Sequence, residues 1–260
     1  MRRASPIVYA HRGASLEMPE NTIEAFERAF SVGAQAIETD AHMTRDGKVV
    51  LAHDETGLRM AGVSRAIRDV TYDEISTWDV GKGFRAPDGT KPDRPYRVPL
   101  LEEVLSTFPD AFVNIDAKQT KPDMMPALVR IIRQACAQDR VRIASFSSRN
   151  LRHARSLGYD GALGTAAVEL ARAIFAPRIV NRVLPLMGDA AQVPEHGWGI
   201  TFAKQRMIDR LHEAGLRVDF WTIDDPARAR ALIAMGADGI VTNDPRRIAE
   251  AVGVPTQKSS

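Results

Sequence analysis

Two histidines end short apolar stretches in the first half of this 260-residue chain. His11 ends the stretch 7–10, and His53 ends the stretch 49–52. Such stretches are typical of β-strands, and a charged residue follows each histidine. Because an imidazole titrates near neutral pH, the pair suits a general acid and a general base at one site. The other histidines are interpreted as unrelated surface or core residues: His42, His153, His196 and His212.

Three carboxylates occupy comparable positions in two further apolar stretches. Glu38 and Asp40 lie two residues apart, and Asp116 lies near the end of the stretch 112–117. Clustered carboxylates raise one another's pKa unless a cation neutralises them, and oxygen-only ligands suit Mg²⁺ or Ca²⁺ better than zinc. Separate pairing with arginines is the simpler interpretation for any one of them. The three together favour a divalent metal site.

Arg12 and Lys118 add positive charge beside these carboxylates. Guanidinium, ammonium and metal around two imidazoles suit a phosphodiester, whose transition state spreads negative charge over the phosphoryl oxygens. Trp221 is either a core aromatic residue or a hydrophobic wall for an alcohol or glycerol backbone.

The elements that must position these residues alternate between strands and helices. Strands are expected at 7–10, 36–41, 112–117, 141–146, 162–165, 191–193, 217–223 and 239–242. Helices are expected at 22–30, 101–108, 124–137, 149–157, 205–214, 227–235 and 246–252, with 166–187 partly helical. About eight β/α units predict a (β/α)₈ TIM barrel with its site at the carboxyl ends of the strands. A doubly wound sheet is disfavoured because no Gly-x-Gly-x-x-Gly follows the first strand.

Residues 55–99 interrupt this rhythm with several prolines and glycines, so they predict a long irregular insertion in one catalytic domain spanning 1–260. The insertion lies between the second strand region and the second helix. Residues 49–52 return antiparallel after the turn Asp46–Gly47. The sequence contains no Gly-x-Ser-x-Gly elbow, no P-loop, no Cys/His zinc spacing and no His-x-His pair on the first strand. These absences argue against an α/β-hydrolase, an NTPase and an amidohydrolase-type metal barrel.

The net charge is +2, from 35 basic and 33 acidic residues, and gives no reason to expect a nucleic acid partner. The single cysteine and the lack of a long apolar stretch predict a cytoplasmic location. Residues 166–187 are apolar with basic neighbours. They are either a packed barrel helix or a lip that receives an acyl chain and touches the inner face of a membrane. The oligomeric state is left open.

Several motifs spread over the chain carry a resemblance to a known family. They are His11-Arg12-Gly13, Pro19-Glu20-Asn21-Thr22, Glu38-x-Asp40, His53-Asp54, Pro99 to Val104, Ile115-Asp116-x-Lys118, Trp221-Thr222 and Asp238 to Thr242. In these motifs the sequence resembles the glycerophosphodiester phosphodiesterase family. The resemblance implies a metal-dependent TIM barrel that cleaves a small-molecule glycerophosphodiester to glycerol 3-phosphate and an alcohol, with 55–99 as its cap.

By position, the resemblance gives His11 and His53 the acid and base roles. It implies that Glu38, Asp40 and Asp116 bind the metal. It also implies that Arg12 and Lys118 bind the phosphate and that Trp221 packs on the glycerol. Asp116 departs from the glutamate of many relatives. The pattern around 56–72 is similar to lysophospholipase D members, which would act on lysophospholipids to give lysophosphatidic acid. A binding module without turnover would predict gaps in the motifs, and the sequence shows none.

Overall fold

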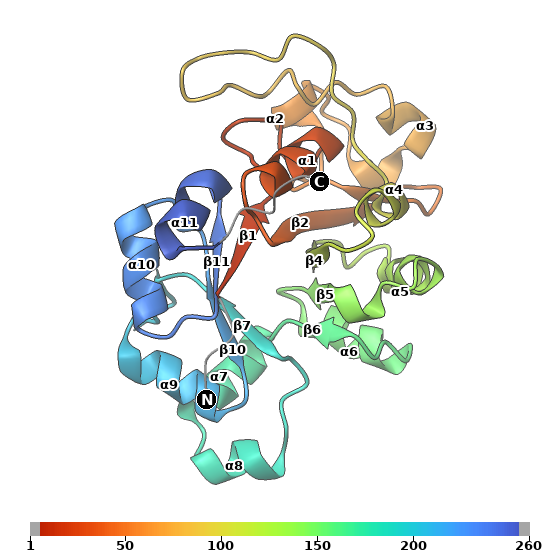
Figure 1. Ribbon diagram of the computed structural model, residues 1–260. Coiled ribbons are helices and arrows are strands. Elements are labelled where there is room, and N and C mark those ends of the chain that lie inside the picture. The colour runs from red at the N-terminus through yellow and green to blue at the C-terminus, as the bar shows by residue number, and fades with distance from the viewer. Residues whose placement is uncertain (1–5, 255–260) are drawn as a thin grey trace.

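The computed structural model describes residues 6–254, and its centre is a barrel of eight parallel strands (Figure 1). The barrel strands are β1 Ile7–His11, β2 Ala36–Met43, β4 Phe112–Ala117, β5 Val141–Ala144, β6 Ala162–Leu163, β7 Ala190–Val193, β10 Arg217–Phe220 and β11 Gly239–Thr242. Their order is β6-β5-β4-β2-β1-β11-β10-β7, and a parallel bridge from Gly164 to Ala190 links the two ends. The predicted TIM barrel is therefore confirmed.

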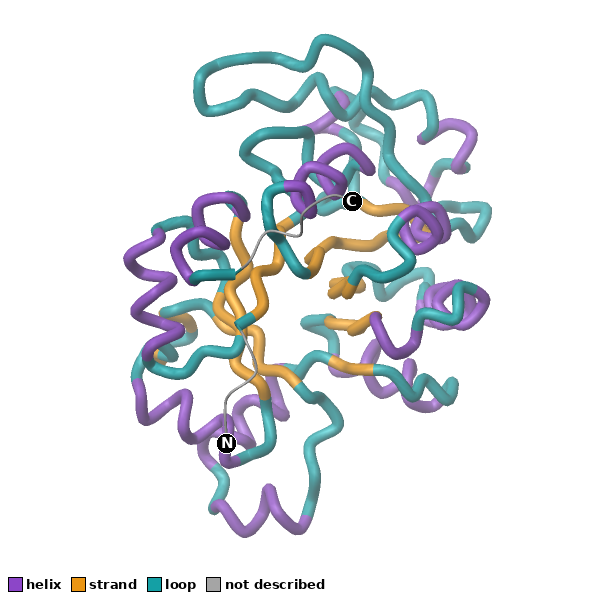
Figure 2. The backbone as a smooth tube through the Cα atoms, viewed as in Figure 1, coloured by secondary structure: helices purple, strands orange, loops and turns teal. Residues whose placement is uncertain are grey.

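Helices surround the strands, as Figure 2 shows, and most begin within one residue of the predicted start. They are α1 Ile23–Ser31, α4 Leu101–Thr107, α5 Met125–Gln134, α6 Ser148–Ser156, α9 Gln205–Glu213, α10 Pro226–Ala234 and α11 Pro245–Val252, with a short 3₁₀ turn η2 at Gln138–Arg140. Side-chain caps define several starts. The Thr22 hydroxyl, for example, accepts a hydrogen bond from the Ala25 amide. Helix α5 ends three residues earlier than predicted.

Alternation along β4 separates the core from the barrel interior, as the sequence pattern predicts. Val113, Ile115 and Ala117 are buried in the hydrophobic cluster between the strands and the helices. Asn114 and Asp116 point the other way and line a pocket. The apolar face therefore holds the strand in place, while the polar face is available for chemistry.

The segment between the second strand region and α4 is more ordered than its composition predicts. β3 Val49–Leu51 pairs antiparallel with β2, as expected. Three short helices follow, namely α2 Leu58–Ala61, the 3₁₀ helix η1 Ile67–Asp69 and α3 Tyr72–Ile75. Their apolar side chains form a separate cluster around Ile67, Ile75 and Trp78. No hydrophobic pattern in the sequence predicts this cluster, because its members lie in different turns and come together only in the folded structure. The extent of the domain, 1–260, stays a prediction, and residues 1–5 and 255–260 lie outside the described part.

On the opposite side of the barrel, residues 166–187 form two helices, α7 Ala167–Phe175 and α8 Arg178–Val183. A small hairpin that the sequence does not predict follows β7, made of β8 His196–Gly197 and β9 Ile200–Thr201. Strands of two residues leave too short a pattern to read. Within residues 6–254, no helix has the length and apolarity needed to cross a bilayer.

A buried charge network closes the amino-terminal end of the barrel. Arg142 donates to the Tyr9 hydroxyl at 3.2 Å and to Asp189 Oδ1 at 2.9 Å. Asp219 is fully buried, with Arg217 NH2 at 3.2 Å and Arg142 NH1 at 3.7 Å. Burial raises the pKa of Asp219, and the two guanidinium groups oppose that shift. The network joins β1, β5 and β10 through charge-assisted contacts.

Asp219→Ala tests the contribution of this network to stability. Removing one partner of a buried charge group leaves the others uncompensated, so we expect a loss of about 3 kcal/mol in the free energy of unfolding. Urea denaturation followed by circular dichroism measures it. Arg65→Ala is the matched control, because it breaks a more exposed pair with Glu74 and should cost far less than Asp219→Ala. Equal losses in the two variants would contradict the expectation.

Candidate active site

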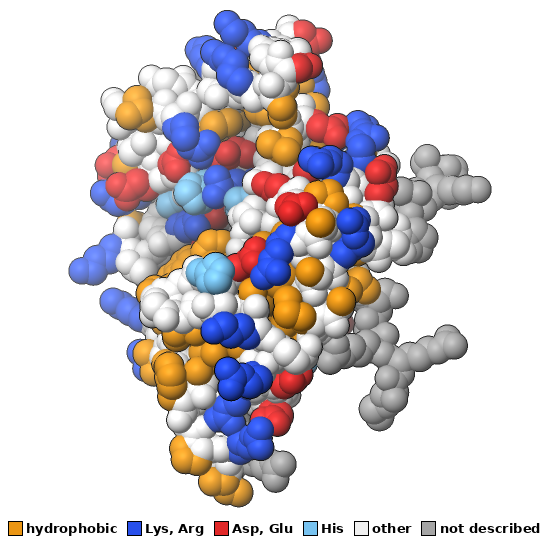
Figure 3. All heavy atoms as spheres, turned by 90° about the vertical axis from the view of Figure 1, so that its left-hand side faces the viewer, with side chains coloured by type: hydrophobic (Ala, Val, Ile, Leu, Met, Phe, Trp, Pro, Cys, Tyr) orange, Lys and Arg blue, Asp and Glu red, His pale blue; other side chains and the backbone are white. Residues whose placement is uncertain are grey.

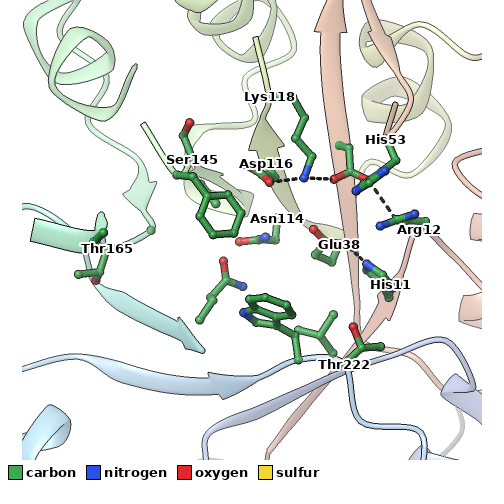
Figure 4. A pocket seen from close by; sticks show the side chains of 18 of the residues that line it. His11, Arg12, Glu38, His53, Asn114, Asp116, Lys118, Ser145, Thr165 and Thr222 are labelled. Atoms are coloured by element: carbon green, nitrogen blue, oxygen red, sulfur yellow. Dashed lines mark hydrogen bonds and ion pairs between the residues drawn. The ribbon is translucent and has the colours of Figure 1, made fainter. Parts of the chain in front are cut away.

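One pocket of about 330 Å³ opens at the carboxyl ends of the barrel strands (Figure 4). All eight residues that the sequence singles out line it: His11, Arg12, Glu38, Asp40, His53, Asp116, Lys118 and Trp221. They come from the middle of β2, from the ends of β1, β4 and β10 or the residue just after each of them, and from the residues after β3. The structure thus brings the candidate residues together, while the role of each remains a prediction.

Both candidate histidines are held through the same ring nitrogen. His11 Nδ1 lies 2.7 Å from Asn243 Oδ1, and the Asn243 amide nitrogen donates to Asp224, which fixes the amide orientation. His53 Nδ1 lies 2.8 Å from Asp54 Oδ1. Since these oxygens can only accept, Nδ1 carries the proton in each neutral ring and Nε2 is left to exchange protons. Burial, and then the charge of Arg12, lower the pKa of His11 and favour its neutral form.

The turn after β1 places Arg12 beside the carboxylates. Arg12 has a φ of 59°, and its amide donates to the Glu38 carbonyl at 2.7 Å. Left-handed backbone at a non-glycine residue is uncommon and gathers at functional sites. Gly13 follows at φ 87°, where a Cβ atom would lie 2.7 Å from Ala25. Only glycine therefore fits the turn that directs Arg12 into the pocket.

The register of β2 on β4 sets the carboxylates side by side. Asp40 pairs with Asp116, and Glu38 pairs with Asn114. The Lys118 ammonium lies 2.9 Å from Asp40 Oδ1 and 2.6 Å from Asp116 Oδ2. Arg12 Nε lies 3.2 Å from Asp40 Oδ2. Burial opposes the charged ammonium, but Asp40 and Asp116 together raise the pKa of Lys118. Two of the three carboxylates thus have cationic partners.

Oxygen atoms left without partners show whether a metal would fit. Glu38 Oε2, Asp116 Oδ1 and Asn114 Oδ1 are buried, and no described residue donates a hydrogen bond to them. Burial, followed by the charges of Asp40 and Asp116, raises the pKa of Glu38 well above its usual value. A hard cation would satisfy such oxygens and restore the charged carboxylate. In residues 6–254, however, no three His, Cys, Asp or Glu side chains are already arranged to hold a metal.

Several residues that line the pocket, or that support its side chains, escape the sequence interpretation. Asn114 shares the inward face of β4 with Asp116, so strand alternation could have identified it. Asn243 directly follows β11, and the same strand-end rule applies to it. Phe146 lies in a loop because β5 ends at Ala144, two residues before the predicted end of the strand, and Trp198 lies in the turn between β8 and β9. No periodic pattern predicts the direction of a side chain in a loop.

The two sides of the pocket differ in character. Figure 4 places His11, Arg12 and His53 on one side and Ser145 and Thr165 on the other. Large apolar side chains complete the far side: Phe146, Leu170 and Trp198. Phe146 and Trp198 are 65% and 67% exposed, so they stand at the mouth and not in the core. The arrangement suits a ligand with an anionic centre and an apolar part.

The chain is similar in sequence to one known family and to several named proteins. The sequence profile of the Glycerophosphoryl diester phosphodiesterase family matches residues 11–247. A probable glycerophosphodiester phosphodiesterase 2 of Mycobacterium tuberculosis is 30% identical, with 94% of this chain and 89% of that protein covered. A lysophospholipase D of Homo sapiens is 26% identical, with 92% and 83% covered.

A solved structure shares the fold. It is an Oleispira antarctica phosphodiesterase in complex with the product sn-glycerol-3-phosphate, with a TM-score of 0.77, 24% identity and coverage of 96% of this chain and 97% of that chain. The profile match includes both candidate histidines, the carboxylates and the two cations in chain order. The chain therefore belongs to the glycerophosphoryl diester phosphodiesterase family.

Proposed function

We propose that this protein hydrolyses glycerophosphodiesters to glycerol 3-phosphate and an alcohol. The observation that carries the proposal is the pair of Nδ1-anchored histidines facing one pocket with Arg12 and Lys118. A site that only binds phosphate needs the cations but not two proton-exchanging groups. The product named for the Oleispira antarctica relative supports the same product class here.

The roles follow from the atoms that face the pocket. Arg12 and Lys118 bind the phosphoryl oxygens, where negative charge grows in the transition state. One imidazole Nε2 takes a proton from the attacking hydroxyl or water, and the other gives a proton to the departing alcohol oxygen. Trp221 packs on the glycerol carbons.

Glu38, Asp40 and Asp116 would hold a divalent cation, Mg²⁺ or Ca²⁺. The unpartnered oxygens of Glu38 and Asp116 support this proposal, whereas the Lys118 contacts show that Asp40 and Asp116 are also neutralised by the protein. When bound, such a cation would stabilise the charge that develops on the phosphoryl oxygens. The aspartate at position 116 reaches one methylene less far than a glutamate would.

A second candidate function is the release of the head group from a lysophospholipid, giving lysophosphatidic acid. The apolar side of the pocket favours it, because a deacylated glycerophosphodiester has no chain to place against Phe146, Leu170 and Trp198. The human relative named lysophospholipase D supports the same substrate class. The shared site would carry out the same chemistry on both substrates.

We also propose that residues 166–187 touch a membrane surface. Leu170 and Ala173 pack inward, so part of this segment is an ordinary barrel helix. Apolar side chains remain exposed on it: Val168, Phe175, Ile179, Val183 and Leu184. Figure 3 shows hydrophobic side chains at the lower end of the molecule, where Figure 1 places α8, with basic groups above them. An apolar edge with basic neighbours suits the interface of an anionic bilayer. A cytoplasmic location stays a prediction.

A substrate panel tests the function and its metal together. We expect turnover of at least one glycerophosphodiester or lysophospholipid in Mg²⁺ or Ca²⁺, loss of turnover in EDTA, and recovery when the metal is returned. Asp116→Ala should remove activity with little loss of stability, because it relieves repulsion among buried carboxylates while Lys118 keeps Asp40 as a partner. Asp123→Ala, outside the pocket, is the control. Full activity in excess EDTA would overturn the metal proposal and leave the phosphodiesterase proposal intact.

Single histidine variants test the proton-transfer roles. His11→Ala and His53→Ala should each lower kcat by roughly 10²–10⁴-fold, since each removes one proton-exchanging group. His153→Ala is the matched control, because His153 pairs with Asp123 away from the pocket. Steady-state kinetics on the best substrate of the panel measures the kcat of each variant. A His53→Ala variant with wild-type kcat would remove that residue from the mechanism.

Phe175→Glu tests the membrane contact. Phe175 is 71% exposed, so the change should leave folding intact while it places charge in the proposed contact. We expect weaker flotation with anionic vesicles and slower turnover of vesicle-borne lysophospholipid. Leu58→Glu is the control, because Leu58 is similarly exposed but lies on α2, across the barrel. Unchanged flotation and turnover in Phe175→Glu would show that this edge faces water.

A further inference from the structure

One arginine outside the pocket contacts the supports of two candidate site residues. Arg59 lies on α2, in the segment between β3 and α4. Its Nε donates to Asp54 Oδ2 at 2.6 Å, and its NH1 and NH2 donate to the two carboxylate oxygens of Glu20 at 2.9 and 2.7 Å. A guanidinium group that engages three carboxylate oxygens is held in one orientation by its planar fork.

Each of these carboxylates continues into the site. Asp54 Oδ1 accepts from His53 Nδ1 at 2.8 Å, and Glu20 Oε1 accepts from Arg12 NH1 at 3.1 Å. The chain of contacts therefore runs from the proton-exchanging His53 to the phosphate-binding Arg12 through one guanidinium. These two residues follow different strands, and β3 and β1 do not pair with each other.

From these contacts we propose that Arg59 is a positioning residue, which sets the orientation of His53 and of Arg12 at the same time. The inference rests on the proposed function, because it needs His53 and Arg12 to act on the substrate. It makes the folded segment 55–99 a condition for an active pocket. The segment would then do more than cover the barrel.

The packing of α2 supports a fixed position for Arg59. The Gly83 amide donates to the Met60 carbonyl at 2.8 Å, and a Cβ atom at Gly83 would overlap the Arg59 carbonyl oxygen. Ala61 is buried in the cluster that includes Trp78. Gly83 and the cluster around Trp78 thus both hold the backbone of α2, and this packing within the segment 55–99 sets the position of the Arg59 guanidinium.

The ionisation of the two carboxylates agrees with this role. Burial alone would raise the pKa of Glu20, but hydrogen bonds and charge from Arg59 and Arg12 lower it overall. Burial also opposes the charged form of Asp54, and hydrogen bonds from Arg59 and His53 lower its pKa. Both carboxylates stay charged near neutral pH and can accept from the site residues. An exposed ion pair usually contributes little to stability. The contacts of Arg59 with Glu20 and Asp54 would instead affect the rate of turnover, because they orient the residues proposed to act on the substrate.

Arg59→Ala and Arg59→Lys, compared with Arg65→Ala and Arg65→Lys, test the proposal. Arg65 lies in the same segment and pairs with Glu74 outside the pocket. We expect both Arg59 variants to lose about 10²-fold in kcat/KM, because a small misplacement of reacting groups costs that much. Lysine keeps the charge but cannot span both carboxylates. Millimolar guanidinium should restore part of the activity of Arg59→Ala and leave Arg65→Ala unchanged.

A readout without turnover separates this inference from the proposed function. Nitrogen NMR of the imidazoles should show His53 as the Nδ1–H tautomer in the wild-type protein and as a mixture in Arg59→Lys, with a similar Tm for both. Wild-type kcat, KM and His53 tautomer in the two Arg59 variants would overturn the inference. An inactive wild-type protein would instead overturn the proposed function, and the tautomer comparison would still decide on Arg59.

Discussion

The pairing register of β2 with β4 is the constraint on which the site depends. It places Asp40 opposite Asp116 and Glu38 opposite Asn114, so acidic groups meet where water is scarce. A slip of one residue would turn each of these side chains to the outer face. Carboxylates this close are stable only when cations compensate them, and Arg12 and Lys118 partly do so. The same cations are the groups proposed to bind the phosphodiester, so the residues that compensate the carboxylates would also recognise the substrate.

Charge also organises the opposite end of the barrel, with a different result. There Arg142 and Asp219 face each other in the interior, and neither lines the pocket. Both networks contain buried polar atoms without a hydrogen-bond partner among the described residues: Asp219 Oδ2 and Arg217 Nε at the amino-terminal end, and Glu38 Oε2 and Asp116 Oδ1 at the carboxyl-terminal end. The difference is that Glu38 and Asp116 line the pocket, where a ligand can reach them, whereas Asp219 and Arg217 do not. Unpaired polar atoms are costly in a protein interior, so those that line the pocket are the ones that a bound ligand would compensate.

Sequence patterns predict the barrel and the polar side of its pocket because both depend on short-range rules. Alternation in β4 separates Ile115 from Asp116, and strand ends locate His11 and His53. The same rules fail for the segment 55–99 and for the β8–β9 hairpin. Trp78 and Ile67 come together through tertiary contacts between turns, and Trp198 is directed by a loop. No local period encodes either arrangement.

This division has a consequence for substrate choice. The groups proposed for chemistry stand on β1, β2 and β4 or within two residues of the ends of β1, β3 and β4, and the sheet fixes the positions of these strands. The apolar side comes from Phe146 after β5, Leu170 on α7 and Trp198 in the hairpin. Loops and peripheral helices tolerate change far better than paired strands do. The groups proposed for chemistry and the fit to the alcohol or acyl portion can therefore vary independently, so changes in the loops can alter the preferred substrate without altering the reaction.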